Sequence, residues 1–234
     1  MNQANAEMLQ SAIDDLGDLA DEVMFVGGAT VEFWISDDAA PEFRPTDDVD
    51  IVVQISTQIE YYQLDERLKE RGFRNHPEGG VICRYKHRDS EVILDAIPTE
   101  ASIVGFTNDW LKVAFVYAEE VSLPSGKEIR AITPPYLLAT KLEAFATRGK
   151  DDLYGSRDFE DVIALIDGRE ELIDEVSASP KELRSYVSQE LERIGGLEDF
   201  ESGLEGALPM APETPERVEL VLLPRIEALK ACRP

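Results

Sequence analysis

The sequence has few of the residues that build several common kinds of site. Its only two cysteines, Cys83 and Cys232, lie far apart, so neither a zinc motif nor a disulfide framework is indicated, and both fit a reducing cytoplasm. It has only two histidines. Because metal-dependent hydrolases commonly use histidine ligands, this argues against that class of enzyme. No apolar run approaches the roughly 18–20 residues that cross a bilayer, and the polar start MNQANAEMLQ is unlike a signal peptide. We therefore expect a cytoplasmic protein without a membrane segment.

Positive charge is also scarce. The chain has 48 acidic and 23 basic residues, which gives a formal net charge of −25. Such a chain repels phosphate backbones at long range, which counts against broad nucleic-acid binding, although local basic groups can still bind a phosphate. Two short basic clusters stand out: Arg84, Lys86 and Arg88, and Arg148, Lys150 and Arg157. The first cluster fits either a phosphate contact or a solvated strand face.

The spacing of apolar residues divides the chain into an α/β half and an all-helical half. In the first half it predicts strands at 24–28, 48–53, 81–87 and 91–97, a hairpin at 119–132, and helices at 6–22, 29–35 and 58–72. In the second half it predicts helices at 135–148, 157–167, 169–177, 180–194 and 213–231, with a loop at 195–212. We expect an α+β fold with two domains: a mixed sheet with flanking helices (1–132) and a helical domain (133–234).

Paired aspartates precede one of the expected strands, in RPTDDVDIVVQI (residues 44–55). Alternate residues of a strand point to the same face, so the carboxylates of Asp48 and Asp50 lie side by side and repel each other. A solvated strand end would accommodate a single aspartate. For the pair, a divalent cation is the obvious compensation.

Two further features fit the same chemistry. Gly27 and Gly28 lie where a strand turns into an expected helix, where glycine allows close backbone approach to a ligand and free N–H groups can meet a phosphate. Asp95 interrupts the apolar run VILDAI, an unfavourable place for an unpaired charge. Taken singly, these are also compatible with a tight turn and a solvated strand end. Together with Asp48 and Asp50, they describe a two-metal site for phosphoryl or nucleotidyl transfer.

The pattern GG…DxD followed by a later aspartate resembles the DNA polymerase β-like nucleotidyltransferases. The resemblance narrows with FVGGATVEFW, RPTDDVDIVV, PPYLLATKLEAF and SRDFED to the AbiEii/AbiGii abortive-infection toxins, and covers most of residues 23–170. It implies a polymerase β-like mixed sheet and transfer of a nucleotidyl group from a nucleoside triphosphate to an acceptor hydroxyl. It also implies a two-metal Mg²⁺ site (or Mn²⁺), tRNA as a possible acceptor and an antitoxin protein as a possible partner.

The resemblance also assigns roles to individual residues. It implies metal binding by Asp48, Asp50 and Asp95, with Asp95 activating the acceptor hydroxyl. The triphosphate contacts implied are Gly27, Gly28, Thr30, Lys141 and Asp161, and Asp158 is the further catalytic residue. Many superfamily members have serine at the position of Gly28, and here the first hydroxyl comes at Thr30.

The helical half permits simpler interpretations of the same residues. Lys141 borders the apolar face of its helix and could cover apolar surface with its aliphatic chain. Ser156 is a suitable N-cap, and Asp158 a first-turn acid that the helix dipole favours. For the whole chain, the alternative to an enzyme is a nucleotide-binding or interaction module on the same fold whose chemistry has lapsed. The three retained carboxylates argue against that alternative.

Overall fold

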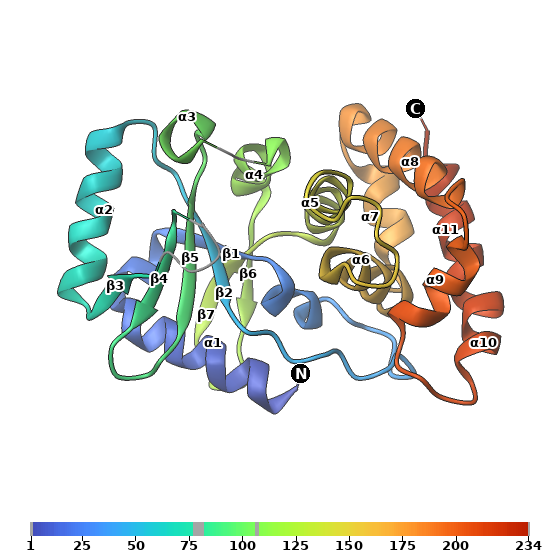
Figure 1. The fold of residues 1–234 in the computed structure, drawn as a ribbon, viewed down its shortest axis with the longest axis horizontal. Coiled ribbons are helices and arrows are strands. Elements are labelled where there is room, and N and C mark those ends of the chain that lie inside the picture. The colour runs from blue at the N-terminus through green and yellow to red at the C-terminus, as the bar shows by residue number, and fades with distance from the viewer. Residues whose placement is uncertain (1, 77–81, 106–107, 234) are drawn as a thin grey trace. The chain divides into compact units, whose positions relative to one another are not determined.

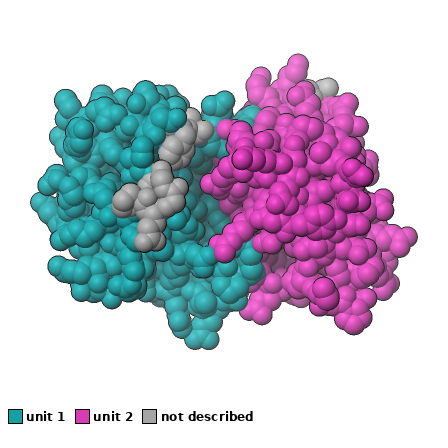
Figure 2. All heavy atoms as spheres, viewed as in Figure 1, with its two compact units in different colours: residues 1–30, 44–133 teal, residues 31–43, 134–234 magenta. Residues whose placement is uncertain are grey.

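The protein, described here by a computed structural model of residues 2–76, 82–105 and 108–233, forms two compact units. The first comprises Met1–Thr30 and Arg44–Thr133, and the second Val31–Phe43 and Pro134–Pro234 (Figure 2). The first is a sheet with helices and the second is helical, which is the α+β class expected from the sequence.

The first unit is built on a mixed seven-stranded sheet in the order β3-β4-β5-β2-β1-β7-β6 (Figure 1). Its strands are β1 (Val23–Val26), β2 (Val49–Val53), β3 (Phe73–Asn75), β4 (Arg84–His87), β5 (Ile93–Pro98), β6 (Glu119–Ser122) and β7 (Glu128–Ala131). β2 pairs parallel with β5 and antiparallel with β1, while β4 pairs antiparallel with β5. β2 and β5 therefore lie side by side in the interior of the sheet. Val81, where one expected strand begins, lies outside the described residues.

The long helices of this unit are α1 (Gln3–Leu16) and α2 (Gln58–Glu70). The unit also contains two short helices, α3 (Ala101–Val104) and α4 (Asp109–Ala114). α1 contacts β2 and buries an apolar stripe at helical spacing: Leu9, Ala12, Ile13 and Leu16. α2 starts at a capping box in which Thr57 accepts from the backbone of Glu60 and Glu60 accepts from the backbone of Thr57. The short helices α3 and α4 were not expected from the sequence.

The helix expected at 29–35 is wrong. Gly28–Phe33 is instead a short 3₁₀ helix, and the chain is irregular from residue 37 to residue 48. β-branched and aromatic residues dominate this stretch, and they propagate an α-helix poorly. The segment is fixed to the helical unit, because the backbone N–H groups of Ser36 and Asp37 both donate to the carbonyl of Gly168.

The second unit consists of helices that pack around α5 (Pro134–Thr147) and α6 (Arg157–Gly168). The others are α7 (Leu172–Ala178), α8 (Lys181–Gly195), α9 (Phe200–Ala207), α10 (Thr214–Arg217) and α11 (Leu223–Lys230), with a π-helical turn at Val218–Leu222. The loop expected at 195–212 is wrong in part, because α9 forms within it and buries Leu204. The helix expected at 213–231 is confirmed: α10, the π turn and α11 follow one another without interruption from Thr214 to Lys230.

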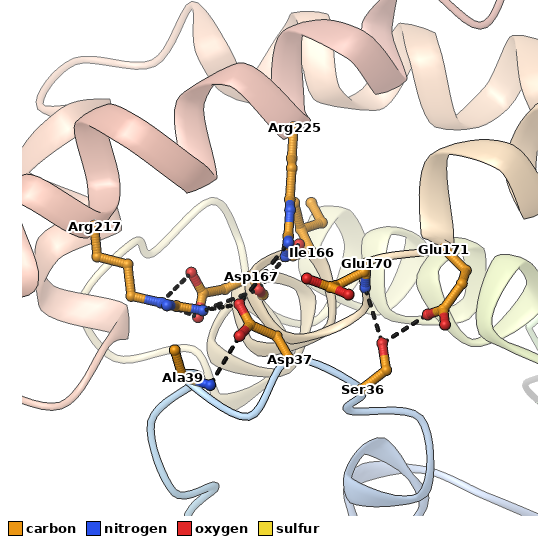
Figure 3. Close-up of polar contacts among 9 residues, drawn as sticks. All are labelled: Ser36, Asp37, Ala39, Ile166, Asp167, Glu170, Glu171, Arg217 and Arg225. Atoms are coloured by element: carbon orange, nitrogen blue, oxygen red, sulfur yellow. Dashed lines mark hydrogen bonds and ion pairs between the residues drawn. The ribbon is translucent and has the colours of Figure 1, made fainter.

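A cluster of buried charges ties the segment 31–43 to these helices (Figure 3). Arg217 donates to both carboxylate oxygens of Asp167 at 2.8 Å and to Asp37 at 2.8 Å. Arg225 donates to the carbonyls of Ile166 and Asp167, near the C-terminal end of α6 where backbone acceptors have no intrahelical partner. A segment separated by about a hundred residues from α5 thus becomes part of the helical unit.

Candidate active site

Strand pairing brings the three expected metal-binding aspartates to one end of β2 and β5. Asp50 and Asp95 are direct partners in the parallel register of these strands, so their side chains lie on the same face. Asp48 precedes β2 by one residue. Asp95 is 7 % exposed, and its burial in an apolar strand makes a partner for its charge necessary.

The partner of these carboxylates is Arg84 on β4. Its Nε and Nη2 donate to the two oxygens of Asp95 at 2.8 and 2.7 Å, and Nη2 also donates to Oδ2 of Asp48 at 2.6 Å. Hydrogen bonds to Asp95 raise the pKa of Arg84 above its ordinary value, so the guanidinium stays charged. Neither expected role of Arg84, a phosphate contact or a solvated strand residue, describes this geometry.

The sequence contained a signal for this contact. Arg84 and Asp95 are equally distant from the turn that joins β4 and β5, and the antiparallel register pairs them directly. Lys86, the next basic residue on β4, pairs instead with Glu91. Arg88 lies beyond the strand and pairs with Asp89. Each of the three basic residues therefore has an acidic partner, and Arg84 and Lys86 lie on the same face of β4.

The turn at Gly27 lies against the carboxylate of Asp50. Gly27 follows β1 with φ +79°, and a Cβ atom there would lie 1.9 Å from Oδ2 of Asp50. Gly28 begins the 3₁₀ helix. Thr30 is fully buried, and its Oγ1 donates to the carbonyl of Gly27 at 2.8 Å. In this structure Thr30 therefore supports the turn from within the protein.

These side chains fit a divalent cation in their chemistry. Over residues 2–76, 82–105 and 108–233, no group of three or more histidine, cysteine or acidic residues is arranged as a formed metal site. Carboxylate oxygens are nevertheless the ligands that Mg²⁺ prefers. Two of the three carboxylates already share one positive charge, since Asp48 and Asp95 both accept from Nη2 of Arg84. At this end of β2 and β5, the carboxylates of Asp48 and Asp95 thus converge on the guanidinium cation of Arg84.

Cys83, next to Arg84, has a buried side chain whose thiol stays protonated near neutral pH. Burial, reinforced by the negative charge of Asp95, raises the pKa of its thiol to about 12. Both cysteines are free thiols.

The helical unit has a second polar cluster between α5 and α6. Nζ of Lys141 lies 2.6 Å from Oδ2 of Asp161 and 3.4 Å from Oδ1 of Asp158. The side chains of Lys141 and Asp161 are 10 % and 1 % exposed, so this lysine does not extend to solvent as a surface lysine would. The alternative in which Lys141 only covers apolar surface is therefore wrong.

Asp158 has a second cation that the sequence did not indicate. Arg148 donates from Nε and Nη2 to the two oxygens of Asp158 at 2.7 and 2.8 Å. Burial raises the pKa of Asp158, but hydrogen bonds and charge from Arg148 and Lys141 outweigh it, so the pKa lies below its ordinary value. The N-cap expected at Ser156 is confirmed, because its side chain accepts from the backbone of Phe159.

A pocket of about 460 Å³ opens at this end of α6. It is lined by Arg148, Gly149, Lys150, Asp152, Gly155, Ser156, Arg157 and Asp158. Both of its carboxylates are engaged: Asp158 by Arg148 and Lys141, and Asp152 by the backbone N–H groups of Tyr154 and Gly155. The lining thus contains three basic side chains, those of Arg148, Lys150 and Arg157, beside two acidic ones, within a strongly acidic chain.

Comparison with known families agrees with this geometry. The family model described as nucleotidyl transferase AbiEii toxin, type IV TA system, matches residues 12–229. The chain belongs to this family. The AbiEii match covers nearly the whole sequence and includes both polar clusters. No curated protein sequence matches the chain.

Membership identifies the chain as a nucleotidyltransferase of the AbiEii toxin type, as the motifs had predicted, and the family description adds the type IV toxin–antitoxin class. The mixed sheet followed by a helical region is consistent with the polymerase β-like fold expected for such enzymes. Among the described residues, no helix combines the length and apolar character needed to span a membrane.

Proposed function

We propose that this AbiEii protein transfers a nucleotidyl group from a nucleoside triphosphate to an acceptor hydroxyl and releases pyrophosphate. The supporting observation is the pairing of Asp50 with Asp95 beside Gly27, with Asp48 joined to Asp95 through Arg84. We take the end of a tRNA as the first acceptor to test, and an antitoxin protein as the partner that restrains the enzyme.

Each aspartate has a distinct task in this proposal. Asp48, Asp50 and Asp95 would hold Mg²⁺ or Mn²⁺, which when bound supplies Lewis-acid neutralisation of charge on the transferred phosphoryl group. Asp95 accepts the proton of the acceptor hydroxyl. Gly27 and Gly28 keep the backbone free of side chains next to Asp50, so that a phosphate can approach. Thr30 holds this turn through its bond to the carbonyl of Gly27.

The residues that we propose for phosphate binding in the second half of the chain lie in the helical unit. Lys141 carries its positive charge in a buried site, where charge acts with little screening, and Asp158 and Asp161 orient its ammonium group. Lys150 and Arg157 at the pocket beside Asp158 bind a phosphate of the substrate. Phosphoryl transfer depends on positioning and charge neutralisation more than on a covalent nucleophile, and these residue types supply both.

The test uses the purified chain with Mg²⁺, each α-³²P-labelled nucleoside triphosphate and total RNA. Label in a tRNA-sized band, absent with the Asp48→Asn/Asp50→Asn variant, is the expected result. Asp47→Asn is the matched control, because Asp47 is an exposed neighbour in the same sequence and its loss should leave labelling unchanged.

Other results lead to different conclusions. Label in the double variant equal to wild type would refute the assignment of the aspartates. Label in a protein or small-molecule fraction would change the acceptor but keep the reaction. Triphosphate binding without transfer to any of these acceptors would favour the lapsed nucleotide-binding module.

A further inference from the structure

The guanidinium of Arg84 occupies the position where two of the proposed metal ligands meet. It makes a two-pronged contact with Asp95, at 2.8 and 2.7 Å, and a single contact with Asp48, at 2.6 Å. The three side chains are partly screened from solvent, with exposures of 23 % for Arg84, 31 % for Asp48 and 10 % for Asp95. Charges in such a position interact more strongly than charges at an open surface.

Without a cation, the carboxylates at this end of the sheet would repel one another. Asp50 and Asp95 are held side by side by the strand register, and Asp48 is drawn to the same place by Arg84. Arg84 thus keeps the ligands assembled by supplying one positive charge. Lys86 does not share this task, since its ammonium group pairs with Glu91 on the same hairpin.

We propose that Arg84 is a positioning residue that holds Asp48 and Asp95 together in the metal-free enzyme and competes with the divalent cation for their oxygens. The inference rests on the proposed function, because it takes these aspartates as metal ligands. A carboxylate oxygen that directs a lone pair to Nη2 cannot direct the same lone pair to a metal ion.

The contacts of Arg84 with Asp95 and with Asp48 differ in strength, and the weaker one breaks first when a cation binds. A bidentate guanidinium–carboxylate pair is stronger than a single charge-assisted bond. The contact with Asp48 therefore breaks when a cation binds, while Arg84 retains at least one bond to Asp95. Arg84 in this way sets the cation affinity of the site and keeps Asp95 oriented throughout.

The inference is tested with Mn²⁺ binding to the full chain, measured by electron paramagnetic resonance of the free ion without any nucleotide. Removing one competing unit charge at hydrogen-bond distance should tighten binding of Mn²⁺ to Arg84→Gln about tenfold or more over wild type. Lys86→Gln is the matched control, since it removes the same charge two residues along the strand without touching the aspartates. Its Mn²⁺ affinity should equal that of wild type.

Thermal unfolding provides a second readout. Without metal, Arg84→Gln should melt at a lower temperature than wild type, because the carboxylates lose their counter-charge. Added Mn²⁺ should raise its melting temperature more than that of wild type, since at a given concentration a ligand that binds the folded state more tightly stabilises it more. A damaged fold alone would lower the melting temperature but would not tighten Mn²⁺ binding.

Arg84→Lys extends the test if Arg84→Gln fails to fold, because it retains the charge and loses the planar fork. Its Mn²⁺ affinity should lie between those of wild type and the glutamine variant. Equal or weaker Mn²⁺ binding by both Arg84 variants, with binding lost in Asp48→Asn/Asp50→Asn, would overturn this inference alone. Binding to the Asp48→Asn/Asp50→Asn variant as tight as to wild type would overturn the metal site, and the inference with it.

Discussion

Oδ2 of Asp50 lies where a side chain on Gly27 would have to be, 1.9 Å from an ideally placed Cβ atom. The glycine is therefore required twice, once by its φ of +79° and once by the carboxylate beside it. Asp50 and the turn after β1 are therefore parts of one arrangement, in which the backbone comes close to a carboxylate that we propose as a metal ligand.

Gly27→Ala should accordingly destabilise the protein more than an ordinary substitution of a left-handed glycine. Gly126→Ala is the matched control, because Gly126 has φ +83° and a Cβ atom there would meet nothing within 4 Å. The control should lose about 1–2 kcal/mol of unfolding free energy from its backbone alone. Gly27→Ala should lose more, since Asp50 must also move. Urea unfolding of both variants measures the difference, and equal losses would contradict the close contact.

Lys141→Ala should weaken triphosphate binding and also lower stability, because it leaves Asp161 buried without its cation. Removing one partner of a buried ion pair costs about 3–5 kcal/mol. The double variant Lys141→Ala/Asp161→Asn should regain part of that loss, since no buried charge then remains unpaired. Chemical unfolding of the two single variants and the double variant completes the cycle. Purely additive losses would mean that the two residues do not interact.

Asp158 gives a pH dependence with a defined sign. Its pKa in the folded chain lies below the ordinary value, so the group stabilises the fold at pH values above the unfolded pKa of about 3.9. That contribution is lost as the pH falls through the lower folded pKa. The stability difference between wild type and Asp158→Asn should therefore be constant near neutrality and shrink below about pH 4.

Unfolding free energies of these two proteins between neutral and acidic pH measure this effect. Glu160→Gln, in the same first turn of α6 but only partly buried, serves as the comparison and should change the stability less. A stability difference for Asp158→Asn that grows on acidification would reverse the sign and refute the ion-pair explanation.

The charge cluster in Figure 3 predicts a large effect on stability at residues to which no chemistry is assigned. Burial raises the pKa of Asp167 despite the opposing charge and hydrogen bonds of Arg217, so this carboxylate depends on its partner. Arg217→Ala should cost about 3–5 kcal/mol. Arg88→Ala removes an arginine whose side chain is 64 % exposed and should cost about 0–1 kcal/mol. Similar losses for the two variants would show that the cluster does not fasten the segment 31–43.

The pocket beside Asp158 predicts a selective loss of phosphate binding. Lys150→Ala/Arg157→Ala should bind inorganic tripolyphosphate several-fold more weakly than wild type, because each cation at a phosphate contributes to affinity. Lys127→Ala/Arg88→Ala removes two cations that do not line the pocket and should bind as wild type does. Calorimetric titration measures both, and equal affinities would refute the pocket as a phosphate site.

Local sequence patterns were sufficient for most elements of the fold. The capped helix at Gln58–Glu70, the hairpin at Glu119–Ala131 and the helix that begins after Ser156 follow from caps, turn residues and apolar periodicity. The prediction failed at 29–35. The apolar residues there have helical spacing, but the chain forms a 3₁₀ helix followed by an irregular segment. The chain that follows is held by Gly168, far along the sequence, through the backbone N–H groups of Ser36 and Asp37.

The sequence by itself determined which residue types the proposed site contains: two glycines, three aspartates, and a lysine with two aspartates in the helical half. The glycines and the three aspartates were proposed from the chemistry of binding phosphate and divalent cations, and the residues of the helical half from the resemblance to the AbiEii family. Even the contact between Arg84 and Asp95 was implicit in a symmetric hairpin, because the register of a short hairpin is set by its turn. Tertiary structure alone decided that β5 lies parallel to β2 with Asp95 opposite Asp50, and that Arg217 joins Asp37 to Asp167. Pairings of this kind join segments that are distant in the chain, and they depend on the free energy of the whole packed core, which no local window of sequence contains.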